Sequence, residues 1–444
     1  LNSRPTLAQN SPTADTPKLP LPKADKYIWA IYIAILVISV IELYSASSRE
    51  VTATNVFAPL LRHGQMLVLG AIFTILISRM HYRWLYPLTP IFVTLTILLG
   101  VYVLFKGDII NGARRSTTLL GIAIQPAELL KLAVVLVIAR VMSRQQADRG
   151  VRTAGVAWSA AIVLLCGGLL FSQGLTNTLL LMGISFAMML IAGVEWKKFF
   201  CVLLAYGVVG AGAMIMKHES KPDYSPEEWT YITENGKDYS GKTVTITRSG
   251  TQQNRIARWW GNDSVAKYDE PITSENRQEQ YSYMAQANGG LIGNLPGNSR
   301  ETARLPLAFS DYIFAIVIED WGFVGGLILL ALYLWLLTRA GAIASRCSRV
   351  FPALLVMGMA VLIVLQALFH MAIVTGVFPV SGQPLPLISK GGSSILATSI
   401  AFGIMLSVSR FAVQSNKKRE IDAEILTLPA DMSAENPSKL RSAD

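Results

Sequence analysis

Long apolar blocks, each about as long as a helix that crosses a lipid bilayer, recur along this sequence. Such a helix needs roughly 20 consecutive apolar residues. Hydrophobic residues make up 52% of the chain and charged residues only 15%, whereas roughly a quarter of a soluble domain is charged. We therefore predict an all-α integral membrane protein with about ten transmembrane helices. The predicted spans are 27–45, 64–79, 85–105, 122–142, 154–172, 176–193, 198–216, 307–337, 352–376 and 384–411.

The apolar blocks divide the chain into five parts. Residues 1–26 are rich in Pro, Thr and Lys and cannot bury a core, which predicts a disordered tail. Residues 27–216 hold helices 1–7, and residues 306–413 hold helices 8–10. Residues 217–305 form a large polar loop between helices 7 and 8, and 414–444 form a second polar tail. A connection as long as this loop is usually functional.

Basic residues cluster in alternate connections between the apolar blocks. By the positive-inside rule these connections are cytoplasmic, so we expect both termini in the cytoplasm and the large loop outside it. The net charge of +10 is spread over short clusters rather than one stripe, which argues against a nucleic-acid partner. The clusters are Arg79 and Arg83; Arg140, Arg144, Arg149 and Arg152; Lys197 and Lys198; Arg339, Arg346 and Arg349; and Arg410, Lys417, Lys418 and Arg419.

Part of the large loop has the pattern of a β-hairpin. Trp229 to Thr233 and Thr243 to Thr247 read as two strands on either side of Asn235-Gly236, a favoured turn sequence. No Walker-type or dinucleotide-binding glycine loop occurs in the chain, which argues against nucleotide-driven transport. The three cysteines have no metal or redox spacing, and we predict no metal site from them.

Two oppositely charged residues lie in the fourth predicted span. Glu128 and Lys131 are three positions apart, so they share a helix face and can pair. One interpretation is a structural ion pair that holds two helices together. The other is that the pair, with Arg114 and Arg115 just before the span, forms the wall of a site for an anionic lipid headgroup, because guanidinium groups suit phosphate.

The tenth predicted span opens with a sequence that an ordinary spanning helix would avoid. Ser381 to Ser394 reads SGQPLPLISKGGSS, with two prolines, paired glycines and a lysine. Irregular backbone at membrane depth is tolerated only where it is buried in protein or lines a cavity. We therefore expect a broken helix here, close to a functional site.

Three separated motifs resemble one protein family. NGARRSTTLLGIAIQPAELLKL is similar to the family pattern GARRW…QPSEFxKL, and NGGLIGNLPGNSRETARLPLAFSDYIFAIVIEDWGFVGG to GGLxGxG…LPExxTDFIFAxxxEExGxxG. PVSGQPLPLISKGGSS resembles PxxGxPLPxxSYGGSS. The family is SEDS, the shape, elongation, division and sporulation proteins such as FtsW, RodA and SpoVE. The resemblance extends from Ile28 to Val413 and is strongest to FtsW-like members.

The resemblance implies a peptidoglycan glycosyltransferase in the bacterial cytoplasmic membrane. Its members polymerise lipid II at the outer face, release polyprenyl pyrophosphate and act with a class B penicillin-binding protein. The LPLIS sequence and the long tails favour a role in septal cell division, with divisome proteins as further partners, over a RodA-like role in elongation. No cofactor is implied with certainty, and a divalent cation stays open.

The resemblance also implies site residues. The family's catalytic residue is an Asp in the large loop, some eighteen positions before the Gly-Gly pair that is here Gly289-Gly290. That spacing falls close to Asp269, which is our first candidate, with Asp263 second and Glu270 third. The segment departs from the family's usual DPxxxGY spacing, and Lys390 stands where most members have Tyr. Cationic and polar groups would bind the substrate pyrophosphate. The expected substrate-binding residues are Arg114, Arg115, Gln125, Glu128, Lys131, Ser389, Lys390, Gly391, Gly392 and Ser393.

Two other functions fit the same sequence. A lipid II flippase would also place buried charges and a broken helix in the membrane. A non-catalytic divisome scaffold would use the helices to dock its partner's single transmembrane helix. A polymerase depends on a loop acid such as Asp269, a flippase needs polar residues facing both sides, and a scaffold needs neither.

Overall fold

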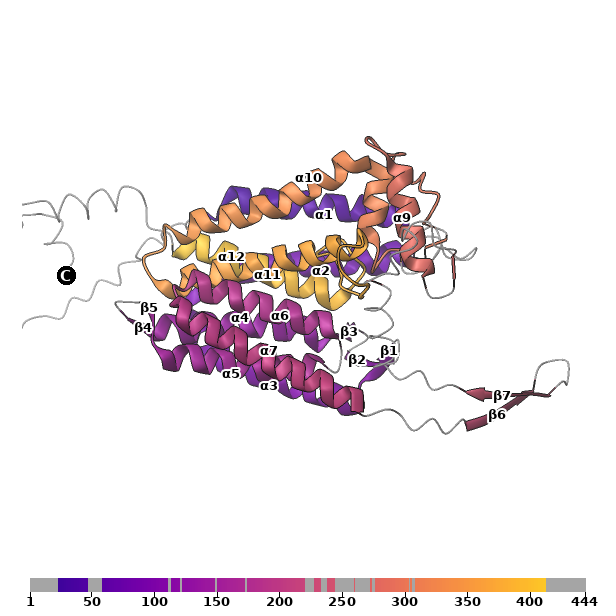
Figure 1. Cartoon of the computed structure of the whole chain (residues 1–444). Coiled ribbons are helices and arrows are strands. Elements are labelled where there is room, and N and C mark those ends of the chain that lie inside the picture. The colour runs from indigo at the N-terminus through magenta and orange to yellow at the C-terminus, as the bar shows by residue number, and fades with distance from the viewer. Residues whose placement is uncertain are drawn as a thin grey trace, which may run out of the picture.

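The computed structural model places long helices side by side in one bundle (Figure 1). It describes residues 23–46, 58–110, 113–119, 122–147, 150–171, 174–219, 227–232, 238–243, 259, 272–273, 276–302, 304–305 and 308–412. The bundle helices are α1 (Lys26–Ala46), α2 (Ala58–Arg79), α3 (Leu85–Lys106), α4 (Pro126–Arg144), α5 (Thr153–Phe171), α6 (Leu175–Ile191), α7 (Trp196–Glu219), α10 (Ile313–Ala344), α11 (Val350–Val374) and α12 (Gly392–Phe411).

The helical membrane-protein class is confirmed, and each predicted span overlaps one bundle helix. Seven of the described helices are long and apolar enough to cross a membrane by length and composition. The other three that overlap predicted spans are α4, α6 and α7. Helix α4 carries four charged residues, and α6 has 17 residues. The exact number of crossings stays a prediction.

Helices α4, α11 and α12 form the centre of the bundle. On α4, the residues from Leu130 to Ala139 are almost completely buried, and α11 and α12 are buried along most of their length. The outer helix α3 instead exposes Ile91, Leu98 and Phe105, each more than half accessible. A broad exposed apolar surface of this kind fits a lipid surrounding rather than water.

Two predicted spans are interrupted. The span predicted at 384–411 is helical only from Gly392, since the prolines and Leu387, at φ 65°, break the backbone before it. The span predicted at 307–337 begins at Ile313 and leaves helical geometry at Gly322, where φ is 70°. Leu291 of another segment approaches Gly322 so closely that a Cβ there would lie 2.3 Å from its carbonyl oxygen.

Small elements cover the two ends of the bundle (Figure 1). Helix α9 (Arg277–Gly289) and the sheet β1–β2–β3 lie at one end, which we call the α9 end, and β4–β5 lies at the other. None of these was predicted, because short strands and a polar helix carry no long apolar pattern. Their remaining bounds are β1 (Asp108–Ile110), β2 (Ala113–Leu119), β3 (Ile122–Ile124), β4 (Gln146–Ala147), β5 (Gly150–Val151) and the 3₁₀ helix η2 (Tyr82–Trp84).

The predicted hairpin of the large loop is present with a different second strand. Strand β6 (Glu227–Ile232) pairs in antiparallel register with β7 (Asp238–Thr243), so the second strand begins five residues before the predicted Thr243. The intervening connection, 233–237, has a length common in hairpins. The predicted strand at 243–247 would have required a connection twice as long.

Helix α1 begins where α12 ends. The backbone N–H of Asp25 donates to the Ser409 hydroxyl over 3.1 Å, and the Arg339 Nε donates to the Asp25 carboxylate over 2.9 Å. The same guanidinium lies over the ring of Tyr27. The start of α1 and the end of α12 therefore lie at the same end of the bundle, opposite α9.

Candidate functional site

The interrupted backbone at 381–391, which we call the broken segment, is held inside the bundle by side chains from several helices. Buried carbonyl oxygens need hydrogen-bond donors, and the broken segment has no helix of its own to supply them. Four successive donors replace that helix. They are His370 to Gln383 O at 2.6 Å, Gln366 to Pro384 O at 3.3 Å, Tyr333 to Pro386 O at 2.7 Å and Ser39 to Leu387 O at 2.8 Å.

The buried ion pair predicted on α4 is present. Lys131 Nζ lies 2.8 Å from Glu128 Oε1, and the two side chains are 0% and 4% exposed. Lys131 also donates to Gln366 Oε1 of α11 over 3.1 Å, and Gln366 Nε2 approaches the second Glu128 oxygen at 3.5 Å. These three residues therefore tie α4 to α11, and through Gln366 they also reach the broken segment.

A second polar chain runs from α11 to α6. His370 of α11 bonds Gln383 O, and the Gln383 side chain donates to Asn177 Oδ1 of α6 over 2.8 Å. All but Asn177 are buried. Gln366 and His370 are four positions apart, so their spacing alone predicts one shared helix face, whereas no spacing predicts the contact of Gln383 with Asn177. The only signal for these two residues in the sequence was that each is polar and lies at the edge of a predicted apolar span.

Of the two predicted arginines, the structure describes the side chain of Arg115 but only the backbone of Arg114. The backbone of Arg114 pairs with Ile109 in the β1–β2 ladder, while its side chain lies outside the described atoms; Arg115 is half-buried on β2. Gln125 is the N-cap residue of α4. Strand β3 pairs with β2 and contacts α12. The strand that carries both arginines is thus linked through β3 to the helix that follows the broken segment.

The predicted residues of the SKGGS sequence differ in their roles. The Ser389 hydroxyl donates to Ser310 O over 2.6 Å and accepts from Leu385 N over 2.8 Å, so it holds the backbone in place. The Lys390 N–H donates to Phe309 O over 2.9 Å. Gly391 is the N-cap of α12 in extended conformation, and Gly392 and the buried Ser393 open its first turn. The first turn of a helix favours anions.

A buried carboxylate organises the loop at the α9 end. Glu319, fully buried on α10, accepts the Ser299 hydroxyl at 2.5 Å and the backbone N–H groups of Arg300 and Glu301 at 2.8 and 3.3 Å. Adjacent carboxylates at 319–320 cannot both face lipid, so one of them is expected to cap a bend or face the interior. Glu319 does both, and it fixes a loop that leads into residues 308–312 beside the broken segment.

The three candidate catalytic acids, Asp263, Asp269 and Glu270, lie outside the described residues. The described parts that flank them attach to the last residue of α11 and to the turn that follows it. Trp259 donates to Gly376 O and Val377 O, both over 3.2 Å. On the other flank, α9 is fixed through hydrogen bonds from Ser282 and Gln286 to Val374 O, at 3.1 and 2.9 Å.

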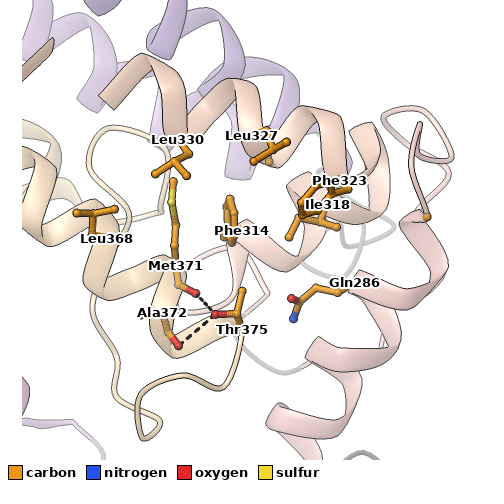
Figure 2. Close-up of a pocket in the computed structure, with 12 residues that line it drawn as sticks. Gln286, Phe314, Ile318, Phe323, Leu327, Leu330, Leu368, Met371, Ala372 and Thr375 are labelled. Atoms are coloured by element: carbon orange, nitrogen blue, oxygen red, sulfur yellow. Dashed lines mark hydrogen bonds between the residues drawn. The ribbon is translucent and has the colours of Figure 1, made fainter. Parts of the chain in front are cut away.

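An apolar groove opens between α9, α10 and α11. It encloses about 490 Å³ and is lined by aromatic and aliphatic side chains, with Gln286 at one edge (Figure 2). Thr375 points its hydroxyl back to Met371 O and Ala372 O, so the hydroxyl is already bonded within α11. The groove therefore offers an apolar contact surface rather than a polar ligand site.

No group of three or more His, Cys, Asp and Glu residues within the described ranges could hold a metal ion. The acids of the large loop, where a divalent cation was left open, fall outside those ranges.

A family model described as "Cell cycle protein", which covers FtsW, RodA and SpoVE, matches residues 25–414. The chain belongs to this family. The SEDS resemblance predicted from the three motifs is thereby confirmed, and the matched range includes the ion pair, the broken segment and the large loop.

Curated FtsW/RodA/SpoVE relatives match along nearly their whole length. The probable peptidoglycan glycosyltransferase FtsW of Geobacter metallireducens is 28% identical over 403 residues, covering 88% of this chain and 97% of that protein. The peptidoglycan glycosyltransferase MrdB of Escherichia coli is 27% identical over 387 residues, covering 86% and 93%. The stage V sporulation protein E of Bacillus subtilis is 27% identical, covering 87% and 97%.

Solved structures share the fold. One describes "structural coordination of polymerization and crosslinking by a peptidoglycan synthase complex"; it is 25% identical with a TM-score of 0.65 and covers 87% of this chain and 98% of that one. The rod shape determining protein RodA of Thermus thermophilus is 23% identical with a TM-score of 0.59, covering 88% and 98%. The latter likeness concerns the fold alone.

Proposed function

We propose that this protein is a peptidoglycan glycosyltransferase that polymerises lipid II at the outer face of the bacterial cytoplasmic membrane. The observation that carries the proposal is the family match over residues 25–414, which includes a polar network buried against the broken segment. Relatives from three bacteria that match over most of their length support the same activity.

The reaction requires a base and a stabilised leaving group. The C4 hydroxyl oxygen of one disaccharide bonds the anomeric carbon of another, while the bond from that carbon to the pyrophosphate oxygen breaks. The hydroxyl proton goes to a carboxylate, for which we propose Asp269, with Asp263 and Glu270 as alternatives. The bond's electron pair leaves with polyprenyl pyrophosphate. Its negative charge would be stabilised by Arg114, Arg115, Lys390 and the first turn of α12, beside the Glu128–Lys131 pair.

Polymerisation by purified protein tests this assignment. Lipid II would be supplied to wild type, Asp269→Asn, Asp263→Asn and Glu270→Gln, each with its cognate penicillin-binding protein. Glycan strands from wild type that disappear in one variant, with thermal stability and partner binding unchanged, identify the base. Strands from all three variants would refute the choice of acids. The same assay with and without EDTA tests for a divalent cation.

The buried α4 core favours polymerisation over the flippase alternative. A transporter needs a polar path to both sides of the membrane. From Leu132 to Ala139, α4 is apolar and at most 8% exposed, and these residues lie between the ion pair and the end of the bundle where α1 begins. On α4, these apolar residues thus separate the ion pair from the end of the bundle opposite α9.

We further propose a crosslinking partner, a class B penicillin-binding protein, whose transmembrane helix would dock in the groove of Figure 2. The solved synthase complex that this chain resembles combines polymerisation with crosslinking. Loss of co-purification on Leu327→Trp, with Leu98→Trp on lipid-facing α3 as control, tests this site. A scaffold without catalysis predicts partner binding with no glycan strands.

The septal role and the orientation also remain proposals. Identities of 28% to FtsW and 27% to MrdB do not separate division from elongation. We retain septal division, with divisome partners, on the LPLIS sequence and the long tails. The start of α1 and the end of α12 lie together, which agrees with both termini on one side, and the basic connections support the proposal that this side is cytoplasmic.

A further inference from the structure

A second cavity lies between α5, α6 and α7. It encloses about 670 Å³, within the usual size of small-molecule pockets. Its lining comes from the second half of α5, the first half of α6 and the middle of α7, with Phe369 and Phe378 from α11 and the turn after it. The cavity therefore occupies the half of the bundle nearest the α9 end.

Three glycines leave open notches in the wall of this cavity. Gly168 on α5 and Gly207 and Gly210 on α7 all line it, and a Cβ at any of the three would meet no atom within 4 Å. Close packing normally fills such space with protein atoms. These notches sit on two helices that face the same cavity, so a ligand with short branches along its length would fill them better than a smooth chain.

The cavity lining leaves no polar group to recognise a headgroup. Among the described residues that line it, only Thr178 and Tyr206 carry hydroxyls, and the other lining side chains are apolar or glycine. Thr178 donates to Gly167 O over 3.3 Å, and Tyr206 donates to Ala160 O over 3.2 Å. A cavity with this chemistry binds hydrocarbon.

The apolar cavity and the polar network share a wall. On α6, Asn177 bonds Gln383 of the network, and the next residue, Thr178, lines the cavity. On α11, His370 bonds the broken segment, and the preceding Phe369 lines the cavity. On each helix, one residue thus contacts the polar network and its neighbour in the sequence lines the apolar cavity. This arrangement suits one molecule with a polar head and a hydrocarbon chain.

An aromatic contact connects the cavity to the large loop. Phe378 lines the cavity, and Trp259 stacks on it with ring centroids 6.4 Å apart and planes at 20°. Trp259 lies only four residues before Asp263 in the sequence. The cavity wall is thus in contact with a residue close in sequence to the candidate acids.

We propose that the α5–α6–α7 cavity binds the polyprenyl chain of the lipid-linked substrate. The identity of the chain rests on the proposed function, whereas the preference for a branched hydrocarbon rests on the notches and the apolar lining. The shared wall holds the chain against the protein while its diphosphate lies towards the polar network.

Photolabelling in phosphatidylethanolamine–phosphatidylglycerol vesicles tests the proposal. The probes are a diazirine-bearing polyprenyl diphosphate and a diazirine-bearing phosphatidylglycerol. The variants Gly207→Leu and Gly168→Leu fill the cavity from different helices, and Gly341→Leu on α10 is the control, since its Cβ also meets no atom within 4 Å and it lies outside the cavity. We expect the polyprenyl probe to label peptides of α5–α7. Both cavity variants should lower that labelling about tenfold, which is the loss of affinity expected when about two methylene groups of the bound chain are displaced.

Unlabelled polyprenyl diphosphate should compete with the probe on wild type, which tests the site without any variant. Absence of that competition, or labelling that the cavity variants leave unchanged, overturns the proposal. Equal labelling by the phosphatidylglycerol probe assigns the cavity to ordinary membrane lipid and also overturns it. Labelling needs no turnover, so a protein that fails to polymerise lipid II would refute the proposed function while leaving this test valid.

Discussion

Lys131 of α4 donates a 3.1 Å hydrogen bond to Gln366 of α11, residues 235 positions apart in the chain. The ammonium is 0% exposed and also pairs with Glu128 at 2.8 Å. Gln366 in turn donates to Pro384 O of the broken segment. One buried cation therefore links two central helices to the irregular backbone at the proposed site, so stability and activity should depend on it together.

Replacing Lys131 with Met should destabilise the protein strongly. The substitution leaves the Glu128 carboxylate buried without its cation, and breaking a buried pair in this way costs about 3–5 kcal/mol. The double variant Glu128→Gln/Lys131→Met should recover much of that loss, because it leaves no buried charge. Thermal unfolding in detergent measures both. A single variant no less stable than the double variant would contradict the ion-pair account.

Tyr333→Phe should weaken the fixation of the broken segment. The hydroxyl donates to Pro386 O over 2.7 Å and is fully buried, so its removal leaves a buried carbonyl without that donor. The expected cost is about 1–3 kcal/mol. Tyr102→Phe on α3 is the matched control, since Tyr102 is half exposed. Equal unfolding temperatures for the two variants would show that the bond does not support the segment.

The contact between Asp25 and Arg339, at the start of α1, should respond to acid. Burial alone would raise the pKa of the Asp25 carboxyl, but the hydrogen bond from Arg339 and the backbone N–H groups of Ile28 and Tyr27 outweigh it and hold the pKa below its ordinary value. A lowered pKa means that the stabilisation is complete above the unfolded value of about 3.9 and is lost as pH falls through the folded value. The unfolding temperature of wild type should therefore exceed that of Asp25→Asn near neutral pH, and the gap should close below about pH 4. A gap independent of pH would contradict this sign.

The helical fold was largely predictable, since apolar blocks of spanning length leave few alternatives in lipid. The interruptions were predictable only in part. The prolines and glycines of 381–394 signal a break by themselves, whereas the kink at Gly322 depends on a backbone approach by Leu291 that no local pattern encodes. Helix α9 escaped prediction because its sequence, Arg277–Gly289, is polar overall.

The candidate site was predictable where two partners lie on one helix face. Glu128 and Lys131 satisfy that condition, and their pair is present. Gln383 and Asn177 meet across 206 positions, and their contact follows from how the broken segment enters the bundle rather than from spacing. The assignment of Asp269, Asp263 or Glu270 came from the family resemblance and stays a prediction.

Glu319→Gln should loosen the loop at 299–302. Both backbone N–H groups donate to one carboxylate oxygen and the Ser299 hydroxyl donates to the other. An amide therefore removes the acceptor of the hydroxyl, and it also removes the negative charge that strengthens the two N–H bonds. We expect amide hydrogen exchange at Arg300 and Glu301 to rise about tenfold or more, the equivalent of losing one such bond. Glu195→Gln serves as the control, because Glu195 is half exposed. Unchanged hydrogen exchange at both amides would show that the Glu319 carboxylate does not order the loop.

Gly322→Ala should be much more harmful than the same change at a helical glycine with free space. Gly322 has a φ of 70°, and a Cβ there would lie 2.3 Å from Leu291 O and 2.5 Å from Ile292 N, so neither the backbone nor its neighbours can accept a methyl group. A backbone at φ 70° and ψ −175° lies in a region that essentially only glycine occupies, and it costs another residue about 1–3 kcal/mol. Gly341→Ala, whose Cβ meets nothing within 4 Å, should instead stabilise α10 slightly. Paired unfolding curves measure the difference, and partner co-purification shows whether the kink also shapes the groove of Figure 2. Comparable stability of the two variants would mean that the segment at 289–295 does not lock against α10.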